Sequence, residues 1–579
     1  IYSYNHTSQP YDHAADLDID PSSQNVIFTG NIFSNVNGND YFYAKTDTLG
    51  NFIYSNIYNG VINGSDYASS MVTDASNLPL VAGGTKSTST GQDGFIVKYD
   101  ATGNEAWQSV FTGTGAFNDY LYAVDINTSG HYYAGGYTEV SSGNYDMWLI
   151  KADGNGSKLW DVALSGTDVG GKDVVSDIYT DNFNNGYAVG YQRNSGTGQD
   201  AAIVKFNSSG NVLWSKKLSG SGNQNDAYRD IGSKTGNIVY AVGYTTKPNG
   251  ESDMLIAKYD NQGNLQWSRT FNSPNNGNDT AISVNVDANQ NIAVVGRGDS
   301  TKVMTVKYDA SGNLQWSTFE SMVTEVGPDV VTLPSGLTFI TCFFDSTFSD
   351  YSNRVICYDN AGAKLWHRDY VYSCCEHPMK MAKTANGNII VAIDYYGLIG
   401  AIELDTLGNE LNNVLTTLNI QYGDQAYGGT RDLKIDGNGD IYVTGYFSAD
   451  GNTGSDVVTQ KICYTPAPVS ISGSVNVCAQ SQGNLYGVTS NTTVTNYAWT
   501  ATNGLSVNTG SVSSAISVNA GNASGYVIVQ QTNYCGIGNP DSLLVNVNAL
   551  PSVSAGTDQL ICPSTSVILN GSGAQSYAW

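Results

Sequence analysis

The sequence predicts an all-β protein, and three observations carry this expectation. Gly (64 residues) and Tyr (39) are abundant while only 13% of the residues are charged, a composition that favours strands and turns over helices. A pattern of alternating strands recurs about every fifty residues through most of the chain. Gly-Asn pairs, which are typical of tight hairpin turns, separate strands within the copies.

Each copy opens with an acidic residue and contains four expected strands. The second strand ends in Gly, the third ends in Lys-x-Asp, and the fourth carries an aromatic residue after the Gly-Asn turn. Four short antiparallel strands per repeat are typical of propeller blades, which bury both faces by stacking on their neighbours. We therefore predict a β-propeller of nine repeats, with eight blades as the alternative if the copy around 376–412 packs irregularly. The positions in the fourth strand are Tyr2, Tyr54, Trp107, Trp160, Trp214, Trp267, Trp316 and Trp366, followed by Asn412.

The two ends of the repeat region predict how the ring closes. The segment Ile1-Tyr2-Ser3 matches Ile53-Tyr54-Ser55, a fourth strand, whereas the last copy stops after three strands at Cys463. The N-terminal strand is therefore expected to complete the last blade and to remove the exposed sheet edges. The propeller is predicted to span residues 1–465.

The units containing "AVGYTT", "DMLIAKYDNQGNLQWSRTF" and "VMTVKYDASGNLQWS" resemble a known family. It is the bacterial β-propeller repeat family, whose blades read Asp-x-Ala, Val-x-Gly, Lys-Tyr-Asp and Gly-Asn-x-x-Trp. The resemblance implies secreted or surface proteins without one shared catalytic activity, so it bears on fold more than on function.

After Pro466 the pattern changes to alternating Ser, Thr, Val and Asn. The order Cys478, Trp499 and Cys535 resembles immunoglobulin-like modules of the polycystic-kidney-disease type. This resemblance implies a β-sandwich over 466–549, with Trp499 buried near a Cys478–Cys535 disulfide between the sheets. A second, incomplete immunoglobulin-like module is expected over 550–579.

Tandem modules of this kind are similar to those of large Bacteroidetes surface proteins. The similarity implies export through the type IX secretion machinery, a partner during secretion. It also implies an extracellular or cell-surface location for a mature form that has lost its signal peptide.

Charge and hydropathy exclude some partners. With 51 acidic and 26 basic residues the net charge is −25, which repels nucleic acid and anionic lipid, so no nucleic-acid partner is expected. No run of about 18 apolar residues is present, so no membrane span is expected.

The eight cysteines lie in no CxxC or His-rich zinc spacing, which favours disulfides over a metal. Cys342 and Cys357 are equally far from the centre of the loop between them. We therefore expect a disulfide there, with free thiols as the alternative. The pairing of Cys374, Cys375 and Cys463 is left open.

The acidic residues that open the nine first strands are expected to form a ring on one face. In one interpretation each carboxylate accepts backbone N–H groups at the blade junction, which would lower the pKa of the carboxyl group. In the other the carboxylates form a cation-binding rim. The structural interpretation is favoured. The nine residues are Asp12, Asp66, Asp119, Asp173, Asp226, Asp279, Glu325, Glu376 and Asp424.

Asp436, Asn438 and Asp440 have the alternating oxygen ligands that begin a calcium loop, and calcium is the one cofactor considered. The downstream bidentate Glu is missing, and other blades have plain hairpin turns at this place, so a turn without metal is favoured.

We expect no catalytic residues, because the five His are scattered and neither a nucleophile nor a phosphate-loop motif is present. The favoured function is a secreted surface protein for binding, adhesion or scaffolding, whose variable loops recognise a glycan or a surface protein. The best candidates for ligand binding are Asp350, Tyr351, Glu376 and His377, because their loops depart most from the repeat. The alternatives are a glycan-cleaving enzyme with its site in the propeller mouth, or a structural subunit of an extracellular assembly.

Four short Asp-Ser/Thr-apolar sequences look like the O-glycosylation motif of Bacteroidetes secreted proteins. The expected sites are Thr48, Thr280, Thr406 and Ser542.

Overall fold

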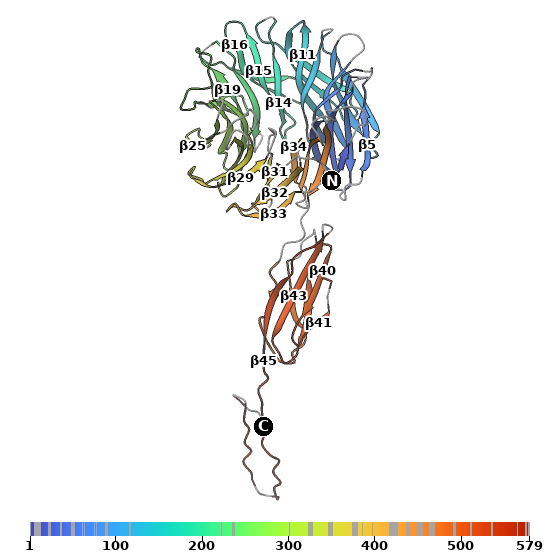
Figure 1. The fold of residues 1–579 in the computed structure, drawn as a ribbon, viewed down its shortest axis with the longest axis vertical. Helices are drawn as coiled ribbons and strands as arrows, with labels where there is room; N and C mark the ends of the chain where they lie inside the picture. Colours follow the sequence, from blue (N-terminus) through green and yellow to red (C-terminus); the bar gives the residue numbers. More distant parts are fainter. Residues whose placement is uncertain are drawn as a thin grey trace. The chain divides into compact units, whose positions relative to one another are not determined.

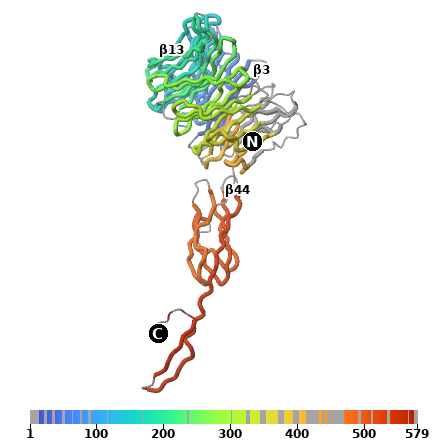
Figure 2. The backbone as a smooth tube through the Cα atoms, turned by 90° about the vertical axis from the view of Figure 1, so that its left-hand side faces the viewer, coloured from blue at the N-terminus to red at the C-terminus, as the bar shows by residue number. Residues whose placement is uncertain are grey.

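A computed structural model gives the fold of the chain. It describes residues 2–576 apart from 5–12, 21–24, 35–37, 48–51, 61, 63, 75, 77, 87–90, 115–116, 169, 222, 234–237, 300–301, 322–327, 346–350, 373–379, 385, 396–397, 416–426, 436–440, 449–454, 463–468, 490–493, 510–511, 534–535, 564–565 and 574–575. The chain forms two compact units, Ile1–Ile462 and Cys463–Trp579. Figure 2 traces both units as a Cα tube.

The first unit is a β-propeller of nine four-stranded antiparallel sheets, as the repeat predicts (Figure 1). Blade 1 comprises β2 (His13–Ile19), β3 (Val26–Ser34), β4 (Gly38–Thr46) and β5 (Phe52–Tyr58). Blade 2 comprises β6 (Tyr67–Thr73), β7 (Pro79–Lys86), β8 (Gln92–Tyr99) and β9 (Glu105–Phe111). Blade 3 comprises β10 (Asp119–Ile126), β11 (Tyr132–Ser141), β12 (Asn144–Ala152) and β13 (Lys158–Leu164).

The next three blades follow in chain order. Blade 4 comprises β14 (Val174–Thr180), β15 (Gly186–Asn194), β16 (Gly198–Phe206) and β17 (Val212–Leu218). Blade 5 comprises β18 (Ala227–Ser233), β19 (Ile238–Thr246), β20 (Ser252–Asp260) and β21 (Leu265–Phe271). Blade 6 comprises β22 (Thr280–Val286), β23 (Ile292–Gly298), β24 (Lys302–Tyr308) and β25 (Leu314–Ser321).

The last three blades complete the ring. Blade 7 comprises β26 (Val330–Thr332), β27 (Thr338–Asp345), β28 (Tyr351–Tyr358) and β29 (Lys364–Tyr372). Blade 8 comprises β30 (Met381–Lys383), β31 (Ile389–Tyr395), β32 (Leu398–Leu404) and β33 (Glu410–Leu415). Blade 9 comprises β34 (Tyr427–Ile435), β35 (Ile441–Ser448), β36 (Ser455–Ile462) and β1 (Tyr2–Tyr4).

The N-terminal strand closes the ring. β1 pairs antiparallel with β36, with Ser3 opposite Val458, and supplies the fourth strand of blade 9. The first strands of successive blades contact one another around the whole ring, including β34 with β2. Figure 1 shows β14 and β34 near the axis and β5 and β25 at the rim. The prediction of a nine-repeat propeller closed by its N-terminal strand is therefore confirmed.

A repeated contact joins each blade to the next. Gly263, in the last turn of blade 5, has φ 77° and lies under the indole ring of Trp214 from blade 4. The indole N–H of Trp214 donates to the carbonyl of Asn261 in the same turn at 3.0 Å. The same arrangement places Gly156 under Trp107, Gly210 under Trp160, Gly312 under Trp267 and Gly408 under Trp366. The Gly-Asn turns and the fourth-strand tryptophans are therefore interblade contacts, which explains why both recur.

The third-strand lysines belong to the same contacts. Lys151 donates to the carbonyl of Ser208 at 2.7 Å, and Lys258 donates to that of Ala310 at 2.5 Å. Lys45 instead pairs with Asp20 of its own blade at 2.9 Å. Because most of these ammonium groups are buried against turn carbonyls or carboxylates, their role is structural.

The second unit is a β-sandwich. One sheet has the order β37 (Ser472–Gly473), β39 (Asn484–Gly487), β42 (Ala515–Ala520), β41 (Leu505–Thr509). The other has the order β38 (Asn476–Cys478), β45 (Asp541–Asn548), β43 (Gly525–Asn533), β40 (Asn496–Ala501), and β44 (Gly536–Ile537) pairs with β43.

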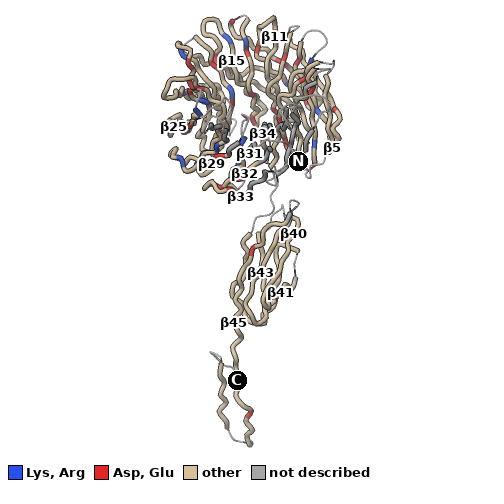
Figure 3. Tube along the Cα trace, in the orientation of Figure 1, with Lys and Arg blue, Asp and Glu red and all other residues tan. Residues whose placement is uncertain are grey.

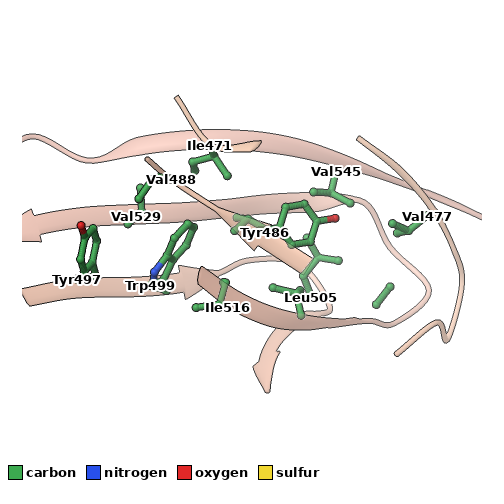
Figure 4. Packing of buried hydrophobic residues seen from close by; sticks show 13 residues of the cluster. Ile471, Val477, Tyr486, Val488, Tyr497, Trp499, Leu505, Ile516, Val529 and Val545 are labelled. Atoms are coloured by element: carbon green, nitrogen blue, oxygen red, sulfur yellow. The ribbon is translucent and has the colours of Figure 1, made fainter. Parts of the chain in front are cut away.

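Trp499 lies in the core of the sandwich, as expected for modules of this kind. It is 5% exposed and packs near Val529 and Ile516 (Figure 4). Its indole N–H donates to the carbonyl of Ser513 at 2.7 Å, so the one polar atom of the ring is satisfied.

The expected disulfide at Cys478 is not formed in this structure. Cys478 is a free, exposed cysteine at the end of β38, beside Asn548. Cys535 lies outside the described residues, but the flanking Asn533 and Gly536 pair with each other at the far end of β43. The order of Cys478, Trp499 and Cys535 thus predicted the burial of Trp499 but not the free, exposed state of Cys478.

The expected Cys342–Cys357 disulfide is also wrong. Cys342 lies opposite Arg354, and Cys357 lies opposite Phe339, so the two cysteines are offset by three positions and point to opposite faces of the sheet. Both are free and buried. Cys342 packs toward blade 6 and Cys357 toward blade 8. Burial raises the pKa of each thiol to about 12. Cys374, Cys375 and Cys463 lie outside the described residues.

The described part of 550–579 contains no regular strand, only a bridge between Ser554 and Ser572. Apolar side chains in this segment are exposed, among them Leu560 and Ile568. Among the described residues, no helix is long and apolar enough to cross a membrane.

Candidate binding surface on the inner strands

The innermost strands share an irregularity. In blades 1–6 and 9 the pairing between first and second strand shifts by one residue, which is a β-bulge. In blade 3 the bulged residue is Tyr122, and in blade 5 it is Arg229. A bulge leaves one residue outside the ladder and re-aims its side chain, so it is a common device next to binding sites.

The recurring Gly of the second strand makes room for the bulge. A Cβ atom on Gly136 would lie 1.9 Å from the carbonyl oxygen of Tyr120, and one on Gly243 would lie 1.9 Å from that of Ala227. The first strand comes so close to the second strand that only glycine fits at the third position of the Val-x-Gly motif.

Tyr122 and six other tyrosines form a cluster on blades 2–5. We call it the tyrosine cluster, and it consists of Tyr67, Tyr120, Tyr122, Tyr137, Tyr145, Tyr191 and Tyr244. The Tyr122 ring lies 4.9 Å from that of Tyr120 and 5.8 Å from that of Tyr137, between ring centroids. Tyr137 meets Tyr145 edge to face at 4.8 Å. These spacings are those of favourable aromatic pairs.

Tyr191 extends the cluster toward blade 5. It interacts electrostatically with Tyr244, Tyr122 and Arg229, so it lies between blades 3 and 5. Burial raises the pKa of Tyr122, Tyr191 and Tyr244, so their phenols are neutral.

The hydroxyl groups of the cluster fall into two sets. Those of Tyr67 and Tyr120 are held by Asn39 (2.8 Å) and Ser69 (3.0 Å). The other five hydroxyl groups have no hydrogen-bond partner among the residues that the structure describes. These belong to Tyr122, Tyr137, Tyr145, Tyr191 and Tyr244. Tyr122 is 43% exposed, unusual for an inner-strand aromatic residue. A phenol usually finds a partner when it is covered, so this set is available to a ligand.

Two cations flank the cluster. The Nζ atom of Lys172 lies 5.1 Å from the centre of the Tyr145 ring, and the Cζ atom of Arg229 lies 5.5 Å from that of Tyr244. Both side chains belong to exposed residues. Cation–π contacts of this kind hold the charged group in place without neutralising it.

The predicted ring of acidic residues is built into the blade junctions. Asp66, Asp119, Asp173, Asp226 and Asp279 are all buried. In blade 5, Asp226 accepts the N–H groups of Gly220 (2.6 Å) and Thr246 (2.8 Å). The corresponding backbone bonds are made in blades 2, 3, 4 and 6. The backbone-acceptor interpretation is thus correct for these five. Asp12, Glu325, Glu376 and Asp424 lie outside the described residues.

The expected direction of their pKa shift is wrong. Burial raises the pKa of all five carboxyl groups, and the hydrogen bonds that each accepts offset this only in part. Desolvation of the charged form outweighs the hydrogen bonds, and the burial that causes it is not visible in the sequence.

A second set of carboxylates, which the sequence analysis missed, links inner strands across blades. Asp16 accepts the N–H of Met71 at 2.8 Å, Asp125 that of Thr180 at 2.7 Å, and Asp329 that of Met381 at 2.9 Å. Each bond satisfies a donor on the inner strand of the following blade. The inner edges would otherwise present unpaired N–H groups.

Asp177 and Asp230 hydrogen-bond to each other, side chain to side chain. Burial and the charge of Asp230 raise the pKa of Asp177 to about 8, and burial raises that of Asp230 to about 6. Two carboxyl groups in direct contact share a proton.

The structure places few of the predicted site residues. Asp350, Glu376 and His377 lie outside the described residues, as do the calcium candidates Asp436, Asn438 and Asp440 and the glycosylation candidate Thr48. Of Tyr351 only the backbone is described, at the start of β28. Within the described part of the chain, no group of three or more His, Cys, Asp or Glu is placed to hold a metal ion.

The remaining glycosylation candidates are described. Ser542 is exposed on β45, Thr280 is half-buried in β22, and Thr406 is half-buried in a turn. Their modification stays a prediction.

A hollow of about 490 Å³ lies between blades 3 and 4, lined in part by His131, Trp160 and Ser208. Burial, and then the charge of Lys151, lower the pKa of His131. Trp160 and Lys151 already donate to Ser208, so this hollow belongs to the interblade contact.

The tyrosine cluster could have been found in the sequence by one signal. In "DYLYAV" Tyr120 and Tyr122 alternate with the apolar residues Leu121 and Ala123, and no other first strand has this pair of aromatics. Tyr137, Tyr191 and Tyr244 give no separate signal, because each follows the Gly that recurs at the end of the second strand.

Comparison with known proteins gives two matching families and no curated relative. The family model of the outer membrane protein assembly factor BamB, a model of PQQ-like repeats, matches residues 67–303, and that of a PKD-like domain matches residues 464–545. No curated protein matches the chain.

Among solved structures, the WD40 domain of SCAP from fission yeast is 9% identical, with 66% of this chain and 94% of that chain covered and a TM-score of 0.36. A protein of unknown function from Dyadobacter fermentans is 10% identical, with 78% and 96% covered and a TM-score of 0.31. Puromycin hydrolase is 9% identical, with 71% and 62% covered and a TM-score of 0.33. Likenesses at these TM-scores carry no argument about this chain. The chain therefore carries a PQQ-like β-propeller repeat region at 67–303 and a PKD-like domain at 464–545.

Proposed function

We propose that this chain is a non-catalytic, secreted binding protein that recognises a glycan through the tyrosine cluster. One observation carries the proposal: the bulge in β10 holds Tyr122 outward, amid tyrosine hydroxyl groups that have no partner among the described residues. Tyrosine combines a flat apolar face, which packs on the apolar face of a sugar ring, with a hydroxyl group that can bond the sugar hydroxyls.

The scaffold beneath the cluster is rigid, which favours binding. Tyr120 and Tyr137 lie opposite each other in the β10–β11 ladder, and the Tyr120 ring packs against Gly84 of blade 2. Side chains fixed before binding lose little conformational entropy when the ligand arrives.

The cluster lies at the end of the blades where the sequence varies. Tyr120 follows the junction between blades 2 and 3, and Tyr145 follows the turn between β11 and β12. Junctions and turns between second and third strands emerge on one face of a propeller, and loops on a rigid scaffold commonly carry recognition. In this proposal the PKD-like domain is a non-binding module of a surface or adhesion protein.

The test is a glycan-array screen of the full chain, followed by titration of the best hit. Tyr122→Ala is expected to weaken binding about tenfold or more, because one stacked aromatic contact is worth about 1 to 3 kcal/mol. The matched control is Tyr526→Ala, which removes a tyrosine that is 44% exposed in the sandwich. Equal affinity of wild type and Tyr122→Ala would overturn the proposal.

The loop residues proposed from the sequence can be tested in the same titration. By their place in the repeat, Asp350, Tyr351, Glu376 and His377 belong to a second–third-strand loop and a blade junction. Alanine at Asp350 or Tyr351 is expected to weaken binding without lowering the melting temperature. Binding that is unchanged in both variants would restrict recognition to the tyrosine cluster.

A further inference from the structure

The two cations beside the tyrosine cluster differ in exposure from the other cations that lie over aromatic rings in the propeller. Six other described cations lie over rings, and all are buried or half-buried: Lys98, Lys151, Lys205, Lys258, Arg269 and Lys307. Arg229 and Lys172 are exposed, and neither forms an ion pair with any described residue. Their charges therefore face the solvent, where a ligand can reach them.

The contacts connect these cations through the cluster. Lys172 lies over Tyr145, which meets Tyr137, and Tyr137 contacts Tyr122. Tyr191 interacts electrostatically with Tyr122 on one side and with Tyr244 and Arg229 on the other, so it extends the series from Tyr122 to Arg229. One positive group therefore lies at each end of a series of aromatic rings that spans blades 3–5.

Two carboxylates beside this series are held by the backbone. Asp173, an electrostatic neighbour of Tyr191, accepts the N–H groups of Gly166 and Arg193. Glu139, an electrostatic neighbour of Tyr137, accepts the N–H of Gly143 at 2.7 Å. Figure 3 colours Lys and Arg blue and Asp and Glu red along the strands of the propeller. Neither carboxylate forms an ion pair with Arg229 or Lys172, so both cations can pair with a ligand.

We propose that the tyrosine cluster binds an acidic polysaccharide built from uronic acids, with sugar rings on the tyrosines and carboxylate groups on Arg229 and Lys172. This inference rests on the proposed glycan-binding function and names its substrate class. A carboxylate is favoured because it is planar and matches the fork of an Arg guanidinium with two parallel hydrogen bonds. A neutral polysaccharide would leave the two cations without a role, and a small anion would leave the series of aromatic rings without one.

The test compares two polymers with the same sugar backbone, one with ionised carboxylates and one with neutral methyl esters. The full chain is titrated with polygalacturonate and with its fully methyl-esterified form, at low salt. We expect the acid form to bind about tenfold more tightly, since a charge-assisted hydrogen bond is worth about 1.5 to 3 kcal/mol. The preference should fall as salt rises, because exposed charges are screened. Dextran sulfate, which carries sulfate groups and no carboxylate, forms a third arm, and tighter binding of it than of polygalacturonate would overturn the choice of carboxylate.

The variants Arg229→Gln and Lys172→Gln locate the site. Each should weaken binding of polygalacturonate and reduce the preference over the ester, at an unchanged melting temperature. The control is Lys216→Gln, which removes an exposed lysine of the outer strand β17 and should leave the affinity unchanged.

The outcomes separate this inference from the proposed function. If acid and ester bind equally and Tyr122→Ala weakens both, the glycan site stands and the acidic ligand is wrong. If other glycans of the array bind and polygalacturonate does not, the acidic ligand is also wrong. If Tyr122→Ala changes the binding of no glycan, the proposed function fails and the inference fails with it.

Discussion

The Cα atom of Gly263 lies beneath the indole ring of Trp214, so a methyl group on this glycine would come within 2.5 Å of the ring. The glycine and the tryptophan belong to successive blades, and their contact is the means by which one blade holds the turn of the next. Its repetition explains why the sequence carries Gly and Trp at a fixed spacing.

Gly263→Ala is therefore expected to destabilise the propeller. The matched control is Gly250→Ala, because Gly250 also has a positive φ (87°) but has open space around its Cα. The control should lose about 1 to 2 kcal/mol from the left-handed backbone alone. The Gly263 variant should lose about 1 to 3 kcal/mol more from the clash with the ring. Denaturant unfolding measures both, and equal losses would show that the ring contact contributes nothing.

Removal of residues 1–8 is expected to lower the melting temperature of the propeller. Ser3 lies opposite Val458 in the last sheet, so the deletion exposes the edge of β36. An exposed edge also promotes association, which size-exclusion chromatography would detect. As a control for chain length, Tyr2–Tyr4 can be replaced by Gly-Ser-Gly, which should also weaken the strand. A melting temperature that is unchanged in the deletion would contradict closure by β1.

The number of blades and the closing strand could be predicted from the sequence because they follow from counting strands in a repeat. The register within a blade could not. Cys342 and Cys357 are symmetric about the middle of their segment, but the β27–β28 pairing is centred elsewhere, with Thr338 opposite Tyr358. When the register of a strand pair shifts by an odd number of residues, each side chain moves to the other face of the sheet. Cys357 lies three positions from the residue opposite Cys342, so the two thiols lie on opposite faces.

The candidate site could be predicted only in part. The loops of the variable face are visible in the sequence, and Asp350 and His377 stand out because they depart from the repeat. Tyr137, Tyr191 and Tyr244 of the tyrosine cluster stand instead at a repeated position. The exposure of Tyr122 depends on the bulge in β10, which the sequence of one blade does not indicate. The pKa direction at Asp226 was missed because burial is a property of the packed junction.

Cysteine reactivity provides a direct test of the chain's redox state. Cys478 is exposed and free, whereas Cys342 and Cys357 are buried thiols whose pKa is raised to about 12. Under native, non-reducing conditions iodoacetamide should modify Cys478 and leave the other two unmodified until the protein is denatured. Peptide mapping by mass spectrometry measures each site. Recovery of Cys478 in a disulfide-linked peptide would contradict the structure.

The contact between Asp177 and Asp230 makes stability depend on pH. Burial raises the pKa of Asp177 to about 8 in the folded chain, against about 3.9 in an unfolded one. The folded state therefore binds more protons than the unfolded state between these values. The sign follows: the contribution to stability is complete below about pH 4 and is lost as pH rises to about 8.

Asp177→Asn should flatten this dependence, because an amide stays neutral and its oxygen can still accept the N–H of Ile178, which bonds to Asp177 at 2.8 Å. Relative to wild type, the variant should gain about 1 to 2 kcal/mol of stability between pH 5 and pH 8.5, after allowance for screening by solvent. Part of the wild-type dependence should remain, since burial also raises the pKa of Asp16 to about 7. Asp260→Asn is the control: the pKa of this turn carboxyl group is lowered, so its loss should reduce stability without flattening the decline above pH 5. The measurement is the melting temperature of the three proteins across this pH range. Parallel curves for wild type and Asp177→Asn would show that ionisation of the Asp177–Asp230 pair does not destabilise the fold.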